Sequence, residues 1–155
     1  MHIGSIAIQK EYKTKLVAEK LSSICKKGDL IALTGELGSG KSTFAKYFIK
    51  NISKVKNVPS PTYNLILSYD SKKSPIYHMD AWRLNSNDEA IALGITEMFE
   101  SSIFIIEWAD KIEKILPNSY LSLSIRNHNN KKKLFFAGDH IWKNRINKAL
   151  LNDNS

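Results

Sequence analysis

One short stretch, residues 35–42, constrains the fold of this chain more than any other. Its sequence, Gly-Glu-Leu-Gly-Ser-Gly-Lys-Ser, agrees with the pattern G-x-x-x-x-G-K-[ST] at every fixed position. Glycines at these places let the backbone curl so that successive N–H groups face one anionic group. The pattern therefore predicts a phosphate-binding loop, provided that a strand enters it and a helix leaves it.

The segments on either side of the loop meet that condition. Residues 30–33 form a short apolar run bounded by glycine, which favours a buried strand. After the loop, Phe44, Phe48 and Ile52 recur at helical spacing, so we expect a helix to begin near Lys41. A strand, a glycine-rich turn and a helix in this order indicate an α/β fold of the P-loop NTPase class.

Two side chains of the loop have positions that suggest their chemistry. Lys41 is expected to contact the β- and γ-phosphates of a nucleotide, and the Ser42 hydroxyl is a candidate ligand of Mg²⁺. The positive end of the helix dipole falls at the same place. The alternative is a glycine-rich loop with a chance lysine, and the two matching flanks argue against it.

A Mg²⁺ site beside such a loop needs an acid, and two acids follow predicted strands. Glu107 follows the apolar run 103–106, and Asp80 follows the less apolar run 76–79. Ligands of open α/β sheets gather beyond the carboxyl ends of the strands, so either acid could bind the metal, directly or through water, or position an attacking water. The pattern ranks Glu107 first. The alternative for either is a solvated acid at a strand end.

Thr62 and His78 lie near these acids in the sequence. Thr62 belongs to a proline-stiffened loop, residues 60–63, where a hydroxyl could sense the γ-phosphate or the metal as switch loops do. A plain structural turn is the alternative. His78 is interpreted as a packed or hydrogen-bonded strand residue rather than a base, because no nucleophile accompanies it.

The rest of the chain alternates between helix and strand patterns without a repeat or a linker, so we expect one domain spanning residues 1–155. Ser86, with Glu89 three residues later, is a candidate helix N-cap. A last helix at 141–150 is expected to be loosely attached, and the tail after about residue 152 to be disordered. The other expected elements are a helix at 11–25, strands at 65–69 and 76–79, a helix at 87–93, a strand at 103–106, and a hairpin of 121–125 with 133–136.

Charge and cysteine content give weaker indications. The net charge of +8 raises the question of an anionic partner, but the excess lies in the flanks 1–28 and 111–155. A rim for the nucleotide, a face for tRNA or partners, and A/T-rich coding are the three interpretations of this excess. The single cysteine, Cys25, leaves no internal disulfide and fits a reducing compartment. With no visible signal peptide and no run near the roughly 20 apolar residues that span a bilayer, we expect a cytoplasmic protein without membrane association.

Four motifs in order resemble the bacterial TsaE family, also called YjeE. They are Gly-Glu-Leu-Gly-Ser-Gly-Lys-Ser-Thr (35–43), Ser-Pro-Thr-Tyr (60–63), His-Met-Asp-Ala-Trp-Arg-Leu (78–84) and Glu-Trp (107–108). The resemblance implies a small P-loop ATPase, with a mostly parallel central sheet, antiparallel additions and flanking helices. It implies ATP/ADP and Mg²⁺ as cofactors and a role in forming threonylcarbamoyladenosine at position 37 of ANN-decoding tRNAs. The implied partners are TsaB and TsaD, whose turnover the ATP cycle supports, with tRNA reached through that complex.

The resemblance also assigns roles by position. Ser42 and Glu107 would surround Mg²⁺, Asp80 would be the Walker-B-like acid and Thr62 the switch residue, so that Lys41, Asp80, Glu107 and Thr62 form the catalytic set. Trp82 stands where the family usually has Tyr, and Ser42 where it usually has Thr. The residues implied to bind the nucleotide are Glu11, Gly38, Ser39, Gly40, Lys41, Ser42, Thr43, Asp80 and Lys132.

Two other functions fit a P-loop domain of this size. A small-molecule or nucleoside kinase is the first, but such enzymes usually close an arginine-rich lid, and this chain has only Arg83, Arg126 and Arg145. A GTPase switch is the second, but no Asn-Lys-x-Asp element occurs. Trp82, Arg83 and Trp108 are interpreted either as a partner-binding hot spot or as packing residues.

Overall fold

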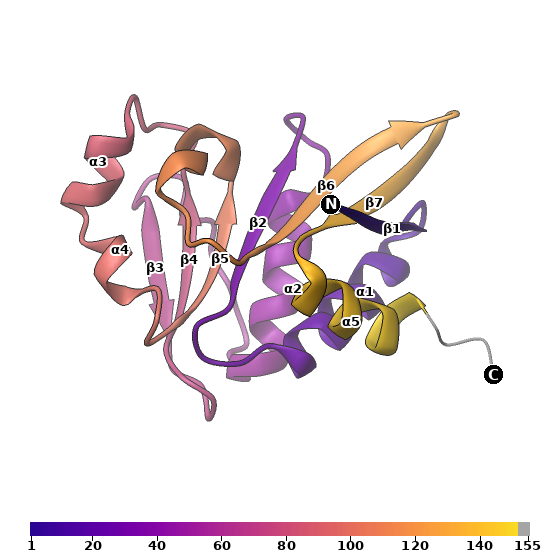
Figure 1. Cartoon of the computed structure of the whole chain (residues 1–155), viewed down its shortest axis with the longest axis horizontal. Coiled ribbons are helices and arrows are strands. Elements are labelled where there is room, and N and C mark those ends of the chain that lie inside the picture. Colours follow the sequence, from indigo (N-terminus) through magenta and orange to yellow (C-terminus); the bar gives the residue numbers. More distant parts are fainter. Residues whose placement is uncertain (152–155) are drawn as a thin grey trace.

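The computed structural model describes residues 1–151, which form one sheet with helices on both faces (Figure 1). Within that range seven strands are hydrogen-bonded in the order β1-β7-β6-β2-β5-β4-β3. The expected disorder beyond residue 152 lies outside the described residues. The strands are β1 (His2–Ala7), β2 (Leu30–Gly35), β3 (Ile66–Tyr69), β4 (Ile76–Asp80), β5 (Ile103–Glu107), β6 (Leu121–His128) and β7 (Lys131–Ala137).

The centre of the sheet is parallel and its edges are antiparallel. Strand β2 pairs in parallel with both β5 and β6, and β4 pairs in parallel with β5. The pairs β1–β7, β6–β7 and β3–β4 are antiparallel. This topology confirms the predicted fold class, a mostly parallel central sheet with antiparallel additions.

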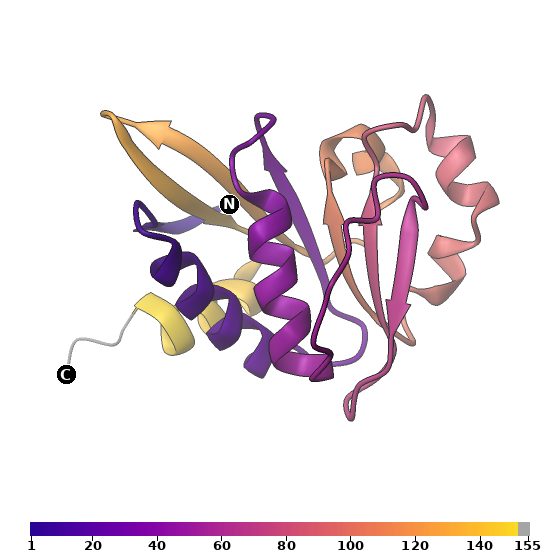
Figure 2. The ribbon, with the colours of Figure 1, turned by 180° about the vertical axis from the view of Figure 1, so that it is seen from behind.

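Strand β2 is buried on both faces, which explains its uninterrupted apolar sequence. Ile31 and Leu33 belong to the core on one face, and Leu30 and Ala32 to the core on the other. Figure 2 shows the two longest helices side by side over the first face. That face carries α1 (Glu11–Ile24) and α2 (Lys41–Ser53), and the second face carries α3 (Asn87–Ala92), α4 (Ile95–Met98) and the 3₁₀ segment η1 (Ala109–Ile115).

The predicted helices and strands are confirmed, with shifts of their ends. Helix α1 ends one residue before the predicted end, and both hairpin strands are longer than predicted. Ser86 caps α3, because its Oγ accepts a hydrogen bond from the N–H of Glu89 at 3.3 Å. The patterns do not predict β1, α4 or η1. No helix within residues 1–151 combines the length and apolar character needed to cross a membrane.

The expectation that the last helix is loosely attached is wrong. Helix α5 (His140–Ile146) begins at Asp139, whose carboxylate accepts hydrogen bonds from two backbone N–H groups of the first turn. The helical path continues as a π-helical segment at Asn147–Leu151. Trp142 and Ile146, one turn apart, are buried in the first core. The apolar face of α5 is therefore short, but its large side chains are buried against the sheet and α1.

A forked ion pair adds to this attachment. The two guanidinium nitrogens of Arg145 donate to the two carboxylate oxygens of Asp29, at 3.1 and 2.6 Å. The same side chain donates to the carbonyl oxygen of Ile24 at 2.7 Å and stacks on the ring of Trp142. Because Asp29 directly precedes β2, the pair joins α5 to the end of α1 and to the strand that leads to the glycine-rich loop.

Candidate nucleotide-binding site

The glycine-rich loop has the backbone conformation that its sequence requires. Gly35 and Gly40 have φ values of 147° and 111°, in the left-handed region that favours glycine. A Cβ atom on Gly35 would lie 2.8 Å from the carbonyl oxygen of Ile125 in β6, so this close approach needs glycine as well. Gly40 caps the N-terminus of α2, which places the free N–H groups of the first helical turn at the loop.

Lys41 lies across the loop and is almost fully buried, with 4% of its surface exposed. Its ammonium group donates to the carbonyl oxygens of Gly35 and Glu36 at 2.7 and 2.8 Å. The Nζ atom also lies 4.1 Å from the ring centroid of Trp108, a cation–π distance. Burial lowers the pKa of Lys41 below its ordinary value, although the charges of nearby acids act in the opposite direction. The cation is thus held at the start of the loop.

The two predicted acids lie side by side at the carboxyl ends of β4 and β5. Asp80 and Glu107 are register partners, and both are buried. The hydroxyl of Ser42 donates to Glu107 Oε1 at 2.6 Å, so the structure brings together the two residues expected around Mg²⁺. Burial alone would raise the pKa of Glu107, but hydrogen bonds from His78 and Ser42 and the charge of Lys41 outweigh it and lower the pKa.

Asp80 and Thr62 form a second contact in the same region. The Thr62 hydroxyl donates to Asp80 Oδ2 at 3.1 Å, and the N–H of Trp82 donates to Oδ1 at 2.9 Å. Ser60 Oγ lies 2.7 Å from Thr62 Oγ1 and extends this contact along the loop. The loop between α2 and β3 therefore reaches the carboxylate of Asp80 through the Thr62 hydroxyl.

The two outlying candidates lie in different places. Lys132 of β7 reaches the loop, because a Cβ atom on Gly40 would lie 3.3 Å from its Nζ atom. Glu11 is exposed at the start of α1, where its charge adds to the effect of burial in raising the pKa of Tyr47. Tyr47 is on α2, so Glu11 faces that helix from the neighbouring one.

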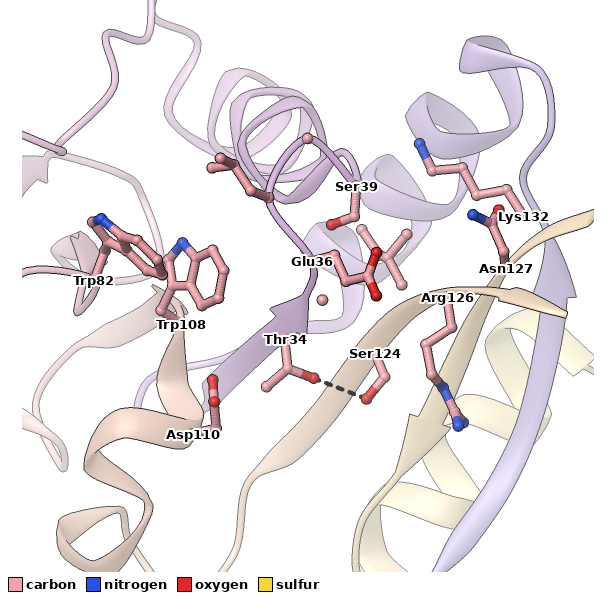
Figure 3. Close-up of a pocket in the computed structure, with 14 residues that line it drawn as sticks. Thr34, Glu36, Ser39, Trp82, Trp108, Asp110, Ser124, Arg126, Asn127 and Lys132 are labelled. Carbon is pink, nitrogen blue, oxygen red and sulfur yellow. Dashed lines mark hydrogen bonds between the residues drawn. The ribbon is translucent and has the colours of Figure 1, made fainter.

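A cavity of about 900 Å³ opens beside the loop (Figure 3). One wall carries Trp82 and Trp108, whose rings lie 4.3 Å apart, together with Asp110. The opposite wall is the β6–β7 hairpin, from which Arg126 and Lys132 extend. Thr34 and Ser124 also line the cavity, and their hydroxyls lie 2.9 Å apart. The sequence analysis did not identify them, because they meet only through the pairing of β2 with β6. The two tryptophans therefore line the site as well as contact each other.

Comparisons with known proteins agree on one family. Residues 8–135 match the family model described as "Threonylcarbamoyl adenosine biosynthesis protein TsaE". A Bacillus subtilis protein named "tRNA threonylcarbamoyladenosine biosynthesis protein TsaE" is 37% identical over 115 residues, which cover 74% of this chain and 72% of that protein. A Haemophilus influenzae protein of the same name is 34% identical over 122 residues, covering 77% of each chain. The solved structure titled "Crystal structure of Bacillus subtilus YdiB" superposes with a TM-score of 0.78 at 25% identity, over 99% of both chains.

Proposed function

We propose, because the chain belongs to the TsaE family, that it binds and hydrolyses ATP as a subunit required for forming threonylcarbamoyladenosine on tRNA. The proposed modification is at position 37 of ANN-decoding tRNAs, and the proposed partners are TsaB and TsaD. In this proposal the ATP cycle supports turnover of the TsaB–TsaD complex, and tRNA is reached through that complex. The relatives named above give no support to the kinase alternative.

The proposed nucleotide site uses the loop backbone and two cations. The N–H groups at residues 38–43 and the dipole of α2 would hold the phosphates. Lys41 contacts the start of the loop and Lys132 approaches its end at Gly40, and Glu11 would flank the nucleotide from α1. Residues 29–110 are slightly acidic overall, so these local groups, rather than bulk charge, would supply the attraction for the anion.

The observation that carries the proposal is the hydrogen bond between Ser42, in the first turn of α2 after the loop, and Glu107 at the end of β5. A hydroxyl and a carboxylate are oxygen ligands of the kind Mg²⁺ prefers, and this cation usually binds through one or two carboxylates together with substrate phosphates. Within residues 1–151 no group of three or more His, Cys, Asp or Glu side chains could hold a metal ion, so phosphate oxygens and water would complete the coordination. When bound, Mg²⁺ neutralises charge that develops on the phosphate oxygens.

The remaining residues suggest how hydrolysis is organised. Asp80 is fixed by the N–H of Trp82 and by the Thr62 hydroxyl, so its carboxylate is held beside the site. We assign to it the positioning of the attacking water and to Thr62 the role of a switch, because movement of its loop would remove one of the two hydrogen bonds on Asp80. Hydrolysis is proposed to be weak in the isolated chain and stronger in the complex.

Purified chain, TsaB and TsaD test the proposal in two assays. The first measures ATP hydrolysis with and without TsaB–TsaD, and the second measures threonylcarbamoyladenosine yield over several turnovers. Lys41→Ala should abolish both signals, whereas Lys46→Ala, an exposed lysine on the same helix, should change neither. Asp80→Ala and Glu107→Ala should impair hydrolysis more than nucleotide binding. A yield that is unchanged when the chain is omitted would overturn the proposal.

A further inference from the structure

Among residues 1–151 the His78 side chain makes one hydrogen bond, and that bond is to the proposed metal ligand, Glu107. Its Nε2 atom lies 2.6 Å from Glu107 Oε2, while the other carboxylate oxygen, Oε1, accepts the bond from Ser42. His78 is fully buried, and its Nδ1 atom has no hydrogen-bond partner among residues 1–151. The imidazole ring is therefore directed at a single target, the carboxylate of Glu107.

Strand register explains why a histidine stands two residues before Asp80. Strand β4 runs parallel to β5, with His78 opposite Ile105 and Asp80 opposite Glu107. Side chains two residues apart on a strand share one face of the sheet, so His78 and Asp80 both lie on the face of Glu107. Glu107 thus has Asp80 as its register partner on β4, and its carboxylate contacts the ring of His78, two residues earlier on that strand.

A buried carboxylate needs such a partner to hold a fixed orientation. Glu107 has three rotatable side-chain bonds, and 2% of its surface is exposed. An unsatisfied buried acceptor costs free energy, so without His78 the Oε2 atom would turn towards whichever donor or water it could reach. With His78 in place, Oε2 is occupied, and Oε1 is left facing Ser42 and the loop.

We propose that His78 is a positioning residue for the metal site: its Nε2–H holds one oxygen of Glu107 so that the other faces Ser42 and Mg²⁺. The inference rests on the proposed function, in which Glu107 and Ser42 hold the ion. Groups that orient metal ligands in this way typically change metal affinity by about 10–100-fold when they are removed. His78 acts through Glu107 and contacts neither the nucleotide nor the ion.

Metal affinity, measured apart from hydrolysis, tests the inference. Electron paramagnetic resonance titration gives the affinity of Mn²⁺, a spectroscopic substitute for Mg²⁺, for the complex of the chain with ADP. His78→Leu removes the donor at similar volume and should weaken Mn²⁺ binding by at least about 10-fold. His78→Gln keeps an N–H donor and should recover most of that loss. Met79→Leu, a volume-conserving change on the other face of β4, is the control and should leave the affinity unchanged.

A double variant separates positioning from a general loss of structure. If His78 acts through Glu107, then His78→Leu added to Glu107→Gln should weaken Mn²⁺ binding no further than Glu107→Gln alone. Additive losses, or wild-type affinity in a folded His78→Leu variant, would overturn the positioning role. Equal Mn²⁺ affinity in the wild type and in Glu107→Gln would instead reject Glu107 as a metal ligand, and with it this inference. Thermal unfolding of each variant checks that it is folded.

Discussion

Replacement of Arg145 by alanine removes the fork that attaches the C-terminal helix. The change eliminates both hydrogen bonds to Asp29, the bond to the carbonyl of Ile24 and the stacking on Trp142. The hydrogen bond that the N–H of Lys26 donates to the Asp29 carboxylate, at 2.8 Å, would remain. We therefore expect a loss of stability larger than the removal of a surface charge would give.

The burial of the pair sets the size of the effect. The side chains of Arg145 and Asp29 are 19% and 11% exposed. Exposed ion pairs contribute about 0.2–1 kcal/mol, whereas breaking a fully buried pair costs about 3–5 kcal/mol. This pair lies nearer the buried limit, so we expect the free energy of unfolding to fall by about 2–3 kcal/mol. For a chain of this size that corresponds to a fall in Tm of roughly 5–10 °C.

Urea and thermal unfolding, followed by circular dichroism, measure the change. Lys143→Ala is the matched control, because Lys143 is an exposed cation on the same helix. Arg145→Lys keeps the charge but not the two-pronged geometry, so its Tm should lie between those of the wild type and Arg145→Ala. If Arg145→Ala unfolds at the same temperature as Lys143→Ala, the fork does not attach the helix and the reasoning from burial is wrong.

Three further changes probe the loop and its surroundings. Because the pKa of Glu107 is lower in the folded protein than its ordinary value of about 4.3, its contribution to stability is present above that value and is lost as pH falls through the folded pKa. The wild type should therefore exceed Glu107→Gln in unfolding free energy by more at pH 7 than at pH 4, as measured by urea unfolding. Lys132→Ala should weaken ADP binding in calorimetry. Lys131→Ala should not, because consecutive side chains on β7 lie on opposite faces of the sheet. Gly35→Ala should lower Tm more than Gly38→Ala. A Cβ atom at Gly35 would lie 2.8 Å from the carbonyl oxygen of Ile125, whereas a Cβ atom at Gly38 has no atom within 4 Å.

Each of these expectations has a contrary outcome. A stability difference between wild type and Glu107→Gln that grows on acidification would mean that the carboxylate is not stabilised in its ionised form. Equal ADP affinities for the Lys131 and Lys132 variants would remove the hairpin from the nucleotide site. A Tm for Gly35→Ala equal to that of Gly38→Ala would mean that β6 yields to an added methyl group.

Sequence periodicity and turn chemistry predict the local elements of this fold well. The strand, loop and helix around residues 30–53 follow from an apolar run, a glycine pattern and helical spacing, all within one stretch of chain. Strand β1 is different, since its pairing with β7 joins residues 2–7 to residues 133–137. A six-residue strand that is only partly buried has too little local signal to reveal such a partner.

The residues of the site also fall into two groups, those with a local sequence signal and those whose contacts depend on distant parts of the chain. Lys41, Ser42 and the two acids could be found from a motif and from strand ends, because each lies beside a recognisable local pattern. The contact of His78 with Glu107 depends on the register between β4 and β5, which a single sequence does not specify. The attachment of α5 could not be predicted either, because the partner of Arg145 lies 116 residues earlier in the chain.

The pairing of β2 with β6 has a consequence for synthesis on the ribosome. The glycine-rich loop is complete once α2 has been made, but the strand beside it belongs to residues 121–128, and Thr34 and Ser124 are separated by 90 residues. Until β6 emerges, one edge of β2 has no neighbour, and its backbone groups are open to the wrong partner. The nascent chain therefore carries the whole glycine-rich loop well before the strand that completes its surroundings has been made, and long-range strand pairing of this kind is slow.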